Sequence, residues 1–344
     1  MRSLPASRVP DPADAPQLRW GIAAPGGIAH LFAQAVLAHT KQKLVAVGSR
    51  SIQRAERFAL RYGVDRAYGS YAELMADPGV QAVYVAAPHS EHKWLTLLAL
   101  EAGKPVLVEK AFARNATEAS EMITAAQRAG LTLMEGMWTN CLPRFDILRQ
   151  LLADGLLGQL RLVHADHGHR VPTAARRLFD PELAGGALLD IGVYPVAFAN
   201  FVLGAPRRIT TTGHLTDSGV DAQETMLFSD FPEHAGAEAV LSSSMVTATP
   251  NVANICGSAG RIELDSRFYA PGQVRLVQPD GSAQTSTPPQ MCLHQGLCYE
   301  AAHFAELVVS GRPESPLLPL AGSLAIMRQL DEIREQLGVR YPGE

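Results

Sequence analysis

The chain has 344 residues, of which 47% are hydrophobic and 19% charged, and its formal net charge is −4. This length predicts two domains, and the charge excludes the basic footprint of a nucleic-acid-binding protein. The sequence contains no run of about 18 uncharged apolar residues, so no membrane span is expected. Four cysteines lie without paired metal-ligand spacing, which favours a reducing cytoplasm over a disulfide framework: Cys141, Cys256, Cys292 and Cys298.

Residues 1–17 contain four prolines and two arginines. They lack the apolar segment of a signal peptide. We expect them to form a disordered N-terminal tail.

Residues 18–135 alternate between strand and helix patterns. Strands are expected at 18–24, 44–48, 67–68, 80–86, 106–109 and 132–135, and helices at 28–39, 52–62, 71–76, 91–102 and 116–129. Alternation with apolar strands predicts an α/β domain with a doubly wound parallel sheet, the Rossmann fold. We place this NAD(P)-binding domain at residues 18–138.

Residues 139–344 are expected to form an α+β domain for substrate binding and dimerisation. Helices are predicted at 143–154, 296–310, 320–337 and up to Leu203, and strands at 159–169, 208–214, 224–229, 237–245, 253–257, 260–264 and 274–278. Successive strands with Gly, Pro and Thr turns favour a mostly antiparallel, open sheet. Its uncovered face would serve a homodimer or a dimer of dimers, or hold substrate.

The turn after the first strand reads Ala24-Pro25-Gly26-Gly27-Ile28-Ala29. It resembles the G-x-G-x-x-G/A fingerprint, in which one glycine lets the backbone approach a pyrophosphate. Here Ala24 replaces the first glycine, Gly26 keeps the second, and Ala29 is the small third residue. We assign Ala24, Gly26, Gly27 and Ile28 to cofactor binding; a glycine turn without a ligand is the alternative.

The second strand ends in Ser49-Arg50, and Arg54 follows one helical turn later. A site selective for NAD usually has an acidic residue here to accept the ribose 2′-hydroxyl. A hydroxyl and two guanidinium groups suit a 2′-phosphate instead, so NADP is favoured over NAD. A merely solvated Arg50 is the alternative.

The fourth strand exits through Ala87-Pro88-His89, with His92 shortly after. Small residues there leave room for ribose and nicotinamide, and we include all four among the cofactor-binding residues. For each histidine a structural role is the alternative.

Glu109 and Lys110 end the apolar strand that begins at Val106. Ligands of open α/β sheets bind at the carboxyl ends of the strands, so both side chains are delivered to the expected site, and we assign both residues to cofactor binding. Because an amine can share or lose a proton where a guanidinium cannot, Lys110 is a candidate catalytic residue. A surface lysine at the end of a strand is the alternative.

The segment Gly185–Tyr194 is the second candidate. If it is helical, Asp190 and Tyr194 share one face, and Gly192 exposes the backbone between them to a flat ring or sugar. A Tyr hydroxyl beside an ammonium such as Lys110 could exchange the carbinol proton during hydride transfer. The alternative is a buried core tyrosine with an aspartate at a helix start.

Metal sites have weaker support. His167 and His169 share one face of a strand, but a third ligand at matching spacing is missing. The spacing of Cys292 and Cys298 around a histidine is more typical of a loop. We expect no metal.

Several motifs together resemble the glucose–fructose oxidoreductase and inositol dehydrogenase family, called Gfo/Idh/MocA. They are Trp20-Gly-Ile with Gly26-Gly-Ile-Ala, Ala102-Gly-Lys-Pro-Val-Leu-Val-Glu-Lys110, and Gly185-Gly-Ala-Leu-Leu-Asp-Ile-Gly-Val-Tyr194. Residues 133–139 and 313–344 are similar to the branch with dimeric dihydrodiol dehydrogenases and NADP-dependent D-xylose dehydrogenases. The resemblance covers residues 18–344.

This resemblance implies a cytoplasmic NAD(P)-dependent dehydrogenase acting on a carbinol of a sugar, polyol or cyclic dihydrodiol. It implies that Lys110 touches both the nicotinamide ribose and the reacting oxygen, and that Tyr194 is the acid–base group with Asp190 beside it. Trp138 is assigned to the cofactor. His169 is assigned to the substrate, together with Lys110, Asp190 and Tyr194.

Three positions depart from the family pattern: Ala24 for Gly, Ala111 for the Pro that usually follows the lysine, and Asn140 for Arg. Two other functions stay open on this fold, a non-catalytic NAD(P)-binding regulator and an NAD-dependent glycosidase. A regulator would need the fingerprint but not Lys110, Asp190 and Tyr194 together. A glycosidase would hold NAD tightly, which Ser49-Arg50 does not favour.

Overall fold

The computed structural model describes residues 4–172, 174–287 and 290–344. The chain forms two compact units. The parallel-sheet unit comprises Pro10–Cys141 and Leu293–Leu324, and the antiparallel-sheet unit comprises the residues up to Val9, Leu142–Cys292 and Ala325–Glu344. This division differs from the expected one, which assigned everything after residue 138 to the second domain.

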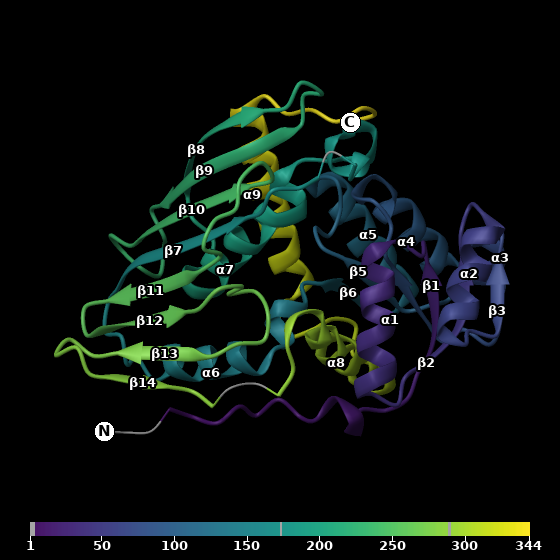
Figure 1. Cartoon of the computed structure of the whole chain (residues 1–344), viewed down its shortest axis with the longest axis horizontal. Helices are drawn as coiled ribbons and strands as arrows, with labels where there is room; N and C mark the ends of the chain where they lie inside the picture. The colour runs from purple at the N-terminus through teal and green to yellow at the C-terminus, as the bar shows by residue number, and fades with distance from the viewer. Residues whose placement is uncertain (1–3, 173, 288–289) are drawn as a thin grey trace. The chain divides into compact units, whose positions relative to one another are not determined.

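The parallel-sheet unit is a Rossmann fold, as expected (Figure 1). Its sheet has the strand order β3-β2-β1-β4-β5-β6, and every pairing is parallel. The strands are β1 Arg19–Ala23, β2 Lys43–Gly48, β3 Arg66–Tyr68, β4 Ala82–Val85, β5 Val106–Glu109 and β6 Leu133–Gly136. The helices are α1 Gly27–His39, α2 Ile52–Tyr62, α3 Tyr71–Ala76, α4 His92–Glu101, α5 Ala116–Ala129 and α8 Leu297–Val309.

Aromatic packing explains why α8 joins this unit although it lies far along the chain. Trp20 of β1 is fully buried. Its ring centroid lies 5.6 Å from that of Phe32 on α1 and 5.3 Å from that of Phe304 on α8. Burial of side chains of this size stabilises by about 1.5–3 kcal/mol each.

The antiparallel-sheet unit has an eight-stranded sheet with the order β14-β13-β12-β11-β7-β10-β9-β8. Only the β7–β10 pairing is parallel, which confirms the mostly antiparallel sheet. The strands are β7 Leu160–Gly168, β8 Arg208–Leu215, β9 Asp221–Ser229, β10 Glu238–Ser244, β11 Ala253–Gly257, β12 Gly260–Leu264, β13 Val274–Val277 and β14 Ala283–Thr285. The sequence did not predict β14.

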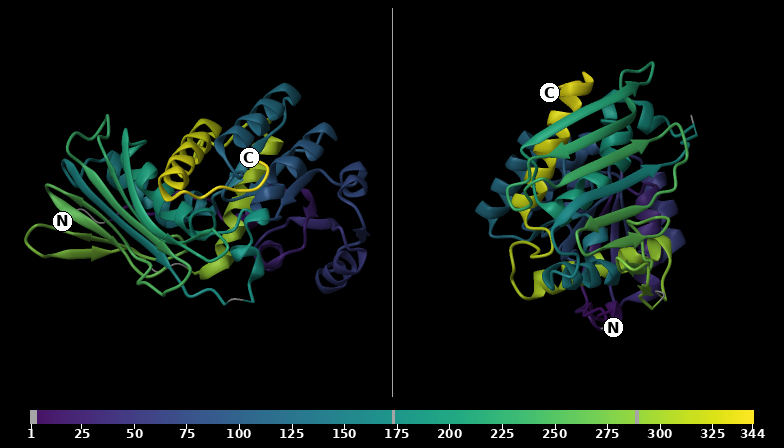
Figure 2. Two further views of the ribbon diagram at one scale, coloured as in Figure 1. Left: turned by 90° about the horizontal axis from the view of Figure 1, so that it is seen from above. Right: turned by 90° about the vertical axis from the view of Figure 1, so that its left-hand side faces the viewer.

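Helices α6 (Pro143–Ala153) and α7 (Val193–Leu203) pack on one face of this sheet. Helix α9 spans Leu320–Leu337. In the described residues of this unit, no helix covers the opposite face, which we call the outer face of the sheet (Figure 2).

Residues 4–17, expected as a disordered tail, make defined contacts. The Arg8 side chain forms an ion pair with Asp146 of α6 at 2.8 Å. Pro12–Asp14 forms a short 3-10 helix, and Ala15 is buried.

The helical run Pro181–Leu203, by length and apolar composition alone, could cross a membrane, with a mean hydropathy of 1.6. However, 78% of its most apolar 18-residue window is buried inside the structure. This burial is typical of a core helix, and the run includes α7.

Candidate active site

The turn between β1 and α1 adopts a glycine-like conformation at Ala24. Its φ is 71°, in the left-handed region that favours glycine. The Ala24 amide donates to the Gly48 carbonyl at 3.1 Å, and its own carbonyl accepts from the Gly26 amide at 2.8 Å. Alanine therefore occupies the glycine conformation, at a local cost of about 1–2 kcal/mol.

The two glycines after it are not required by the folded chain. Gly26 has a φ of −86°, and a β-carbon there would meet only the Ala86 carbonyl oxygen, at 3.6 Å. A β-carbon on Gly27, the first residue of α1, would have no described atom within 4 Å outside its own helix turn. The missing side chains leave space at the amino end of α1, where backbone amides favour a phosphate. This cradle fits the pyrophosphate of a dinucleotide.

The three residues assigned to the 2′-position of the cofactor ribose follow β2 and have different surroundings. Ser49 is buried, and its hydroxyl accepts from the Ser51 amide at 3.2 Å, so it shapes the turn into α2. The Arg50 side chain is 69% exposed and lies 4.0 Å from Glu91, which leaves its guanidinium accessible. Arg54 lies at a hollow beside the phosphate turn.

This hollow has a volume of about 440 Å³ and is lined by Pro25, His30, Arg54, Arg57, Phe58, Leu60 and Arg61. Burial lowers the pKa of His30, as do the nearby Arg61 and Arg54. Sequence reasoning missed Arg57 and Arg61, although their spacing from Arg54 puts all three on one side of α2. The hollow therefore carries more positive charge than Ser49-Arg50 alone indicated.

His92 connects the loops that follow β4 and β5. It is fully buried, and its two ring nitrogens lie 3.0 Å from the carbonyl oxygens of Ala111 and Ala87. Burial lowers its pKa to about 4. The neutral ring carries one N–H, so it donates to one of these two carbonyls and lies between the loops after β4 and β5. The assignment of His92 to the cofactor stays a prediction. His89 is also buried, whereas Ala87 and Pro88 are partly exposed.

Glu109 supports the end of β5 from inside the unit. Its carboxylate accepts hydrogen bonds from the Tyr84 hydroxyl and from the Lys110 amide. Glu109 is buried and Lys110 half-buried, so Lys110 is the more accessible of the two. The assignment of Glu109 to the cofactor stays a prediction. The Lys110–Ala111 peptide bond is cis.

Two further carboxyl groups lie near Glu109. Glu135 of β6 and Glu300 of α8 are both buried. Burial raises the pKa of Glu135 to about 7, with the charge of Glu109 adding to the effect. Burial and Glu109 also raise the pKa of Glu300 well above its usual value. Burial therefore favours the protonated form of both carboxyl groups, and sequence reasoning did not find this cluster.

Trp138 is buried at the end of the parallel-sheet unit, in the 3-10 turn Trp138–Cys141. Its ring stacks on that of His294, with centroids 5.9 Å apart. Asn140, in the same turn, is buried as well. These positions give Trp138 an internal partner, and its assignment to the cofactor stays a prediction.

Asp190 and Tyr194 do not lie on a continuous α-helix. Leu188–Gly192 forms a π-helical turn, and α7 begins only at Val193. The wider turn changes the angle between residues four apart only modestly, so the shared face of Asp190 and Tyr194 stays a prediction. Asp190 forms an ion pair with Arg177 at 3.1 Å, a partner that sequence reasoning missed.

Two glycines of this segment pack against buried carboxylates. Gly186 has a φ of 115°, and a β-carbon there would overlap the Asp221 carboxylate. One on Gly192 would lie 2.8 Å from Glu224 Oε1. Gly192 therefore makes room for an internal side chain, which corrects the expectation that it exposes backbone to a ligand.

Tyr194 lies in an aromatic group of the antiparallel-sheet unit. Its ring centroid is 4.8 Å from that of Tyr269 and 5.3 Å from that of His167. His167 also stacks on Tyr269 at 4.2 Å. His169 follows the end of β7 and is exposed, with its ring 5.6 Å from that of His167.

The predicted site residues thus fall in two groups. The cofactor set and Lys110 belong to the parallel-sheet unit, and Asp190, Tyr194 and His169 belong to the antiparallel-sheet unit. The interaction of Lys110 with Tyr194 stays a prediction. Within the described residues, no group of three His, Cys, Asp or Glu side chains could hold a metal ion.

Known proteins resemble this chain over nearly its whole length. A trans-1,2-dihydrobenzene-1,2-diol dehydrogenase from Xenopus laevis is 36% identical, with 94% of this chain and 99% of the relative covered. The protein of the same name from Homo sapiens is also 36% identical, over 94% of this chain and 98% of the relative.

Among solved structures, a 3-ketoreductase from Actinomadura kijaniata in complex with NADP and TDP-benzene is similar. It has a TM-score of 0.81 and 29% identity, over 94% of this chain and 98% of that one. An aldose-aldose oxidoreductase from Caulobacter crescentus, complexed with glycerol, has a TM-score of 0.82 and 26% identity, over 93% and 97%.

Residues 18–137 match the oxidoreductase family with an NAD-binding Rossmann fold, and residues 145–263 match the GFO/IDH/MocA C-terminal domain. The Rossmann sheet, the glycine turn before α1, Lys110 at the end of β5 and the open second sheet agree with these matches. The chain belongs to the Gfo/Idh/MocA family of NAD(P)-dependent oxidoreductases.

Proposed function

We propose that this enzyme transfers hydride between NADP and a carbinol or carbonyl carbon of a sugar, polyol or cyclic dihydrodiol. The observation that carries the proposal is the vacant space above Gly26 and Gly27. Neither glycine is needed by the folded chain, so a ligand that approaches the amides explains them best. Lys110 directly follows β5, which lies two strands away from β1 in the same sheet.

Cationic groups at the end of β2 support NADP as the cofactor. Arg50 is accessible and Arg54 lines the hollow beside Pro25, and no acidic residue follows β2 before α2. A 2′-phosphate gains charge-assisted hydrogen bonds from guanidinium groups, whereas a ribose 2′-hydroxyl gains more from a carboxylate. The similar 3-ketoreductase was solved with NADP.

The names of the relatives support the substrate class. They refer to a cyclic dihydrodiol, to a ketone reduced by a ketoreductase and to aldoses. All three substrates carry a carbinol or carbonyl carbon that exchanges hydride. A small polyhydroxylated substrate is therefore the class that we propose here.

A bound nicotinamide ring donates or accepts the hydride. In the oxidation direction, the Tyr194 hydroxyl group, as its phenolate, takes the proton from the carbinol oxygen, and it returns the proton in reduction. The Lys110 ammonium holds the same oxygen and stabilises negative charge on it. Asp190, paired with Arg177, orients this arrangement.

A substrate screen tests the proposal. Purified enzyme is incubated with aldoses, polyols and dihydrodiols and with either NADP or NAD, and reduced nicotinamide is followed by its absorbance. We expect turnover with at least one of these classes and a preference for NADP. Tightly held NAD with release of a sugar would instead identify a glycosidase, and cofactor binding without turnover would identify a regulator.

Assembly as a homodimer is supported by the outer face of the antiparallel sheet. Leu227 and Val240 are partly exposed cross-strand neighbours, and Leu162 is exposed on the adjoining strand β7. A two-fold dimer is the commonest way to cover such a face, and a dimer of dimers would use a second surface. Light scattering at micromolar concentration tests this; a monomer would contradict it.

A cytoplasmic location is proposed from the cysteines. None of the four forms a disulfide within the described chain, which suits a reducing compartment. Fractionation of expressing cells, followed by detection of the enzyme, tests this location.

A further inference from the structure

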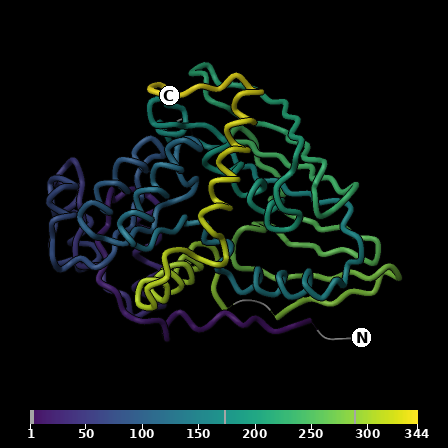
Figure 3. The backbone as a smooth tube through the Cα atoms, turned by 180° about the vertical axis from the view of Figure 1, so that it is seen from behind, coloured from purple at the N-terminus to yellow at the C-terminus, as the bar shows by residue number. Residues whose placement is uncertain are grey.

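The residues after α9 fold back onto the segment that carries Asp190 and Tyr194. Helix α9 ends at Leu337, and Gly338, with a φ of 75°, turns the chain. The amide of Val339 donates to the Arg334 carbonyl at 2.9 Å, an arrangement that reverses chain direction at helix ends. Figure 3 shows the chain leaving the end of this helix. We call residues 338–344 the latch.

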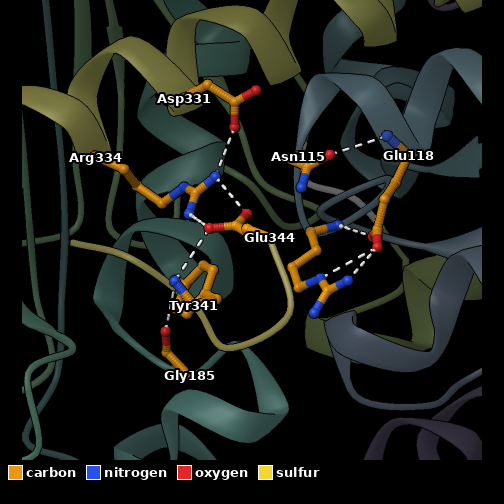
Figure 4. Close-up of polar contacts among 8 residues, drawn as sticks. Asn115, Glu118, Gly185, Asp331, Arg334, Tyr341 and Glu344 are labelled. Carbon is orange, nitrogen blue, oxygen red and sulfur yellow. Dashed lines mark hydrogen bonds and ion pairs between the residues drawn. The ribbon is translucent and has the colours of Figure 1, made fainter.

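Tyr341 is the part of the latch that reaches the segment. It is 3% exposed, and its hydroxyl donates a hydrogen bond to the Gly185 carbonyl at 2.7 Å (Figure 4). Burial raises its pKa well above the usual value, and the nearby carboxyl of Asp221 adds to this effect. The hydroxyl therefore stays protonated and remains a donor at neutral pH.

An ionic group holds Tyr341 in place. The Arg334 guanidinium lies 4.6 Å from the centre of the Tyr341 ring. It donates to both carboxylate oxygens of Glu344 at 2.9 Å and to Asp331 at 2.8 Å. Glu344 also accepts from the Tyr341 amide at 3.0 Å. Arg334 is 5% exposed, whereas the side chains of Asp331 and Glu344 are 31% and 20% exposed. These charge-assisted bonds are therefore partly shielded from water.

On its other side the segment is anchored by Asp221. The Leu188 amide, at the start of the π-helical turn, donates to Asp221 Oδ2 at 2.5 Å. Gly186 lies between the two anchors, with no side chain of its own. The backbone is thus fixed at Gly185 by Tyr341 and at Leu188 by Asp221, directly before the turn that carries Asp190.

We propose that Tyr341 is a positioning residue for the reaction. Its hydroxyl, locked by Arg334 and Glu344, sets the backbone from which Asp190 and Tyr194 project. Without it, the Gly185 carbonyl loses its partner, while Asp221 and the bonds of the Gly185 and Gly186 amides to the Asp180 and Leu178 carbonyls remain. The backbone then shifts, and the phenol group moves away from the reacting oxygen. The inference rests on the proposed role of Tyr194 in proton transfer.

Tyr341→Phe tests the proposal in the full-length enzyme, because it keeps the ring over Arg334 and removes only the hydroxyl. We expect kcat to fall about tenfold, since misplacement by about 1 Å can cost more than that. The KM for NADP should stay unchanged, because the cofactor residues belong to the other unit. Tyr68→Phe is the matched control: it removes a hydroxyl that donates to Asp77 at 3.2 Å, and kcat should not change.

A double-mutant cycle separates positioning from general stability. In a Tyr194→Phe background, Tyr341→Phe should lower kcat no further, because the group it positions is already gone. Independent effects that multiply would overturn the proposal, as would a normal kcat for Tyr341→Phe. A normal kcat for Tyr194→Phe would instead overturn the proposed function of Tyr194.

If Tyr341→Phe does not fold, Glu344→Ala carries the test. It leaves Tyr341 in the chain and removes the acceptor of both Arg334 and the Tyr341 amide. We expect a lower kcat with an unchanged KM for NADP, and partial recovery in Glu344→Gln, whose single amide oxygen can accept from Arg334 and the Tyr341 amide but cannot replace both carboxylate oxygens. An unchanged kcat in Glu344→Ala would overturn the proposed positioning role of the latch.

Discussion

Gly192 packs directly against Glu224: a β-carbon on Gly192 would lie 2.8 Å from the Oε1 atom of Glu224 and 2.6 Å from the Ser243 hydroxyl oxygen. The Ser243 hydroxyl donates to the same carboxylate. Gly192 closes the π-helical turn that precedes Tyr194. The buried carboxylate of Glu224 on β9 therefore occupies the space that a side chain at residue 192 would need.

Gly192→Ala should destabilise the enzyme. Both atoms that the new methyl group would meet are buried and hydrogen-bonded to each other, so they cannot move aside without cost. Overpacking of this kind costs about 1–3 kcal/mol. Denaturant unfolding measures the change, and an unaltered midpoint would show that the turn accepts a side chain.

Gly27→Ala should leave the stability of the enzyme intact and weaken its binding of NADP. The β-carbon meets nothing in the chain, and alanine favours a helix over glycine by up to about 1 kcal/mol. We expect unchanged or slightly higher stability, but NADP affinity at least about tenfold lower through a lost or displaced amide–phosphate contact of about 1.5–3 kcal/mol. Fluorescence titration with NADP checks this. Normal affinity would contradict a pyrophosphate at this turn.

Arg50→Ala and Arg54→Ala should each reduce the preference for NADP over NAD. Loss of a charge-assisted phosphate contact costs about 1.5–3 kcal/mol for NADP and little for NAD, which has no 2′-phosphate. Arg128→Ala, at an exposed position on α5, is the control. Equal affinity of the unaltered enzyme for the two cofactors would contradict the assignment.

The pair Asp221 and Glu224 should make stability depend on pH. Burial raises the pKa of Asp221 to about 6, and burial together with Asp221 raises that of Glu224 well above its usual value. Groups with a raised folded-state pKa stabilise fully below their unfolded pKa, about 4, and this contribution is lost as pH rises through the folded pKa. The free energy of unfolding should therefore fall as the pH rises above about 4.

Glu224→Gln removes one of these titrating groups and keeps its shape. The decline in unfolding free energy from pH 5 to pH 8 should become smaller than in the unaltered enzyme. Glu335→Gln, at an exposed position on α9, should leave the decline unchanged. Parallel pH profiles for Glu224→Gln and the unaltered enzyme would show that Glu224 is already ionised without cost.

The sequence predicted the parallel sheet well because its strands are apolar on both faces and its helices end at recognisable glycines. Gly130, for example, has a φ of 64° directly after α5. The same local signals located the glycine turn before α1. The place of Lys110 directly after β5 could be predicted because the apolar strand before it is recognisable on its own; its catalytic role stays a prediction.

Features that depend on distant residues could not be predicted. The π-helical turn is decided by Asp221 and Glu224, about thirty residues later in the chain, and an i, i+4 pattern fits an α-helix equally well. The ion pair of Arg177 with Asp190 likewise joins a loop whose path carries no periodic signal. Strand β14 has three residues at a sheet edge, too few for an alternating pattern.

The domain boundary failed for a related reason. The return of residues 293–324 to the parallel-sheet unit depends on Phe304 packing against Trp20, a contact between residues almost 300 positions apart. Local sequence patterns alone assign such a segment to the same domain as its neighbours in the sequence.

Turnover of Tyr194→Phe, with a substrate identified by the screen, tests the central claim most directly. The variant keeps the ring in its aromatic group with Tyr269 and His167 and removes only the hydroxyl, so NADP binding should persist. General acid–base catalysis contributes about 10²–10⁴-fold, and kcat should fall by that order, with Lys110→Met costing at least as much. Near-normal turnover of Tyr194→Phe would contradict the account and would direct the search to His169.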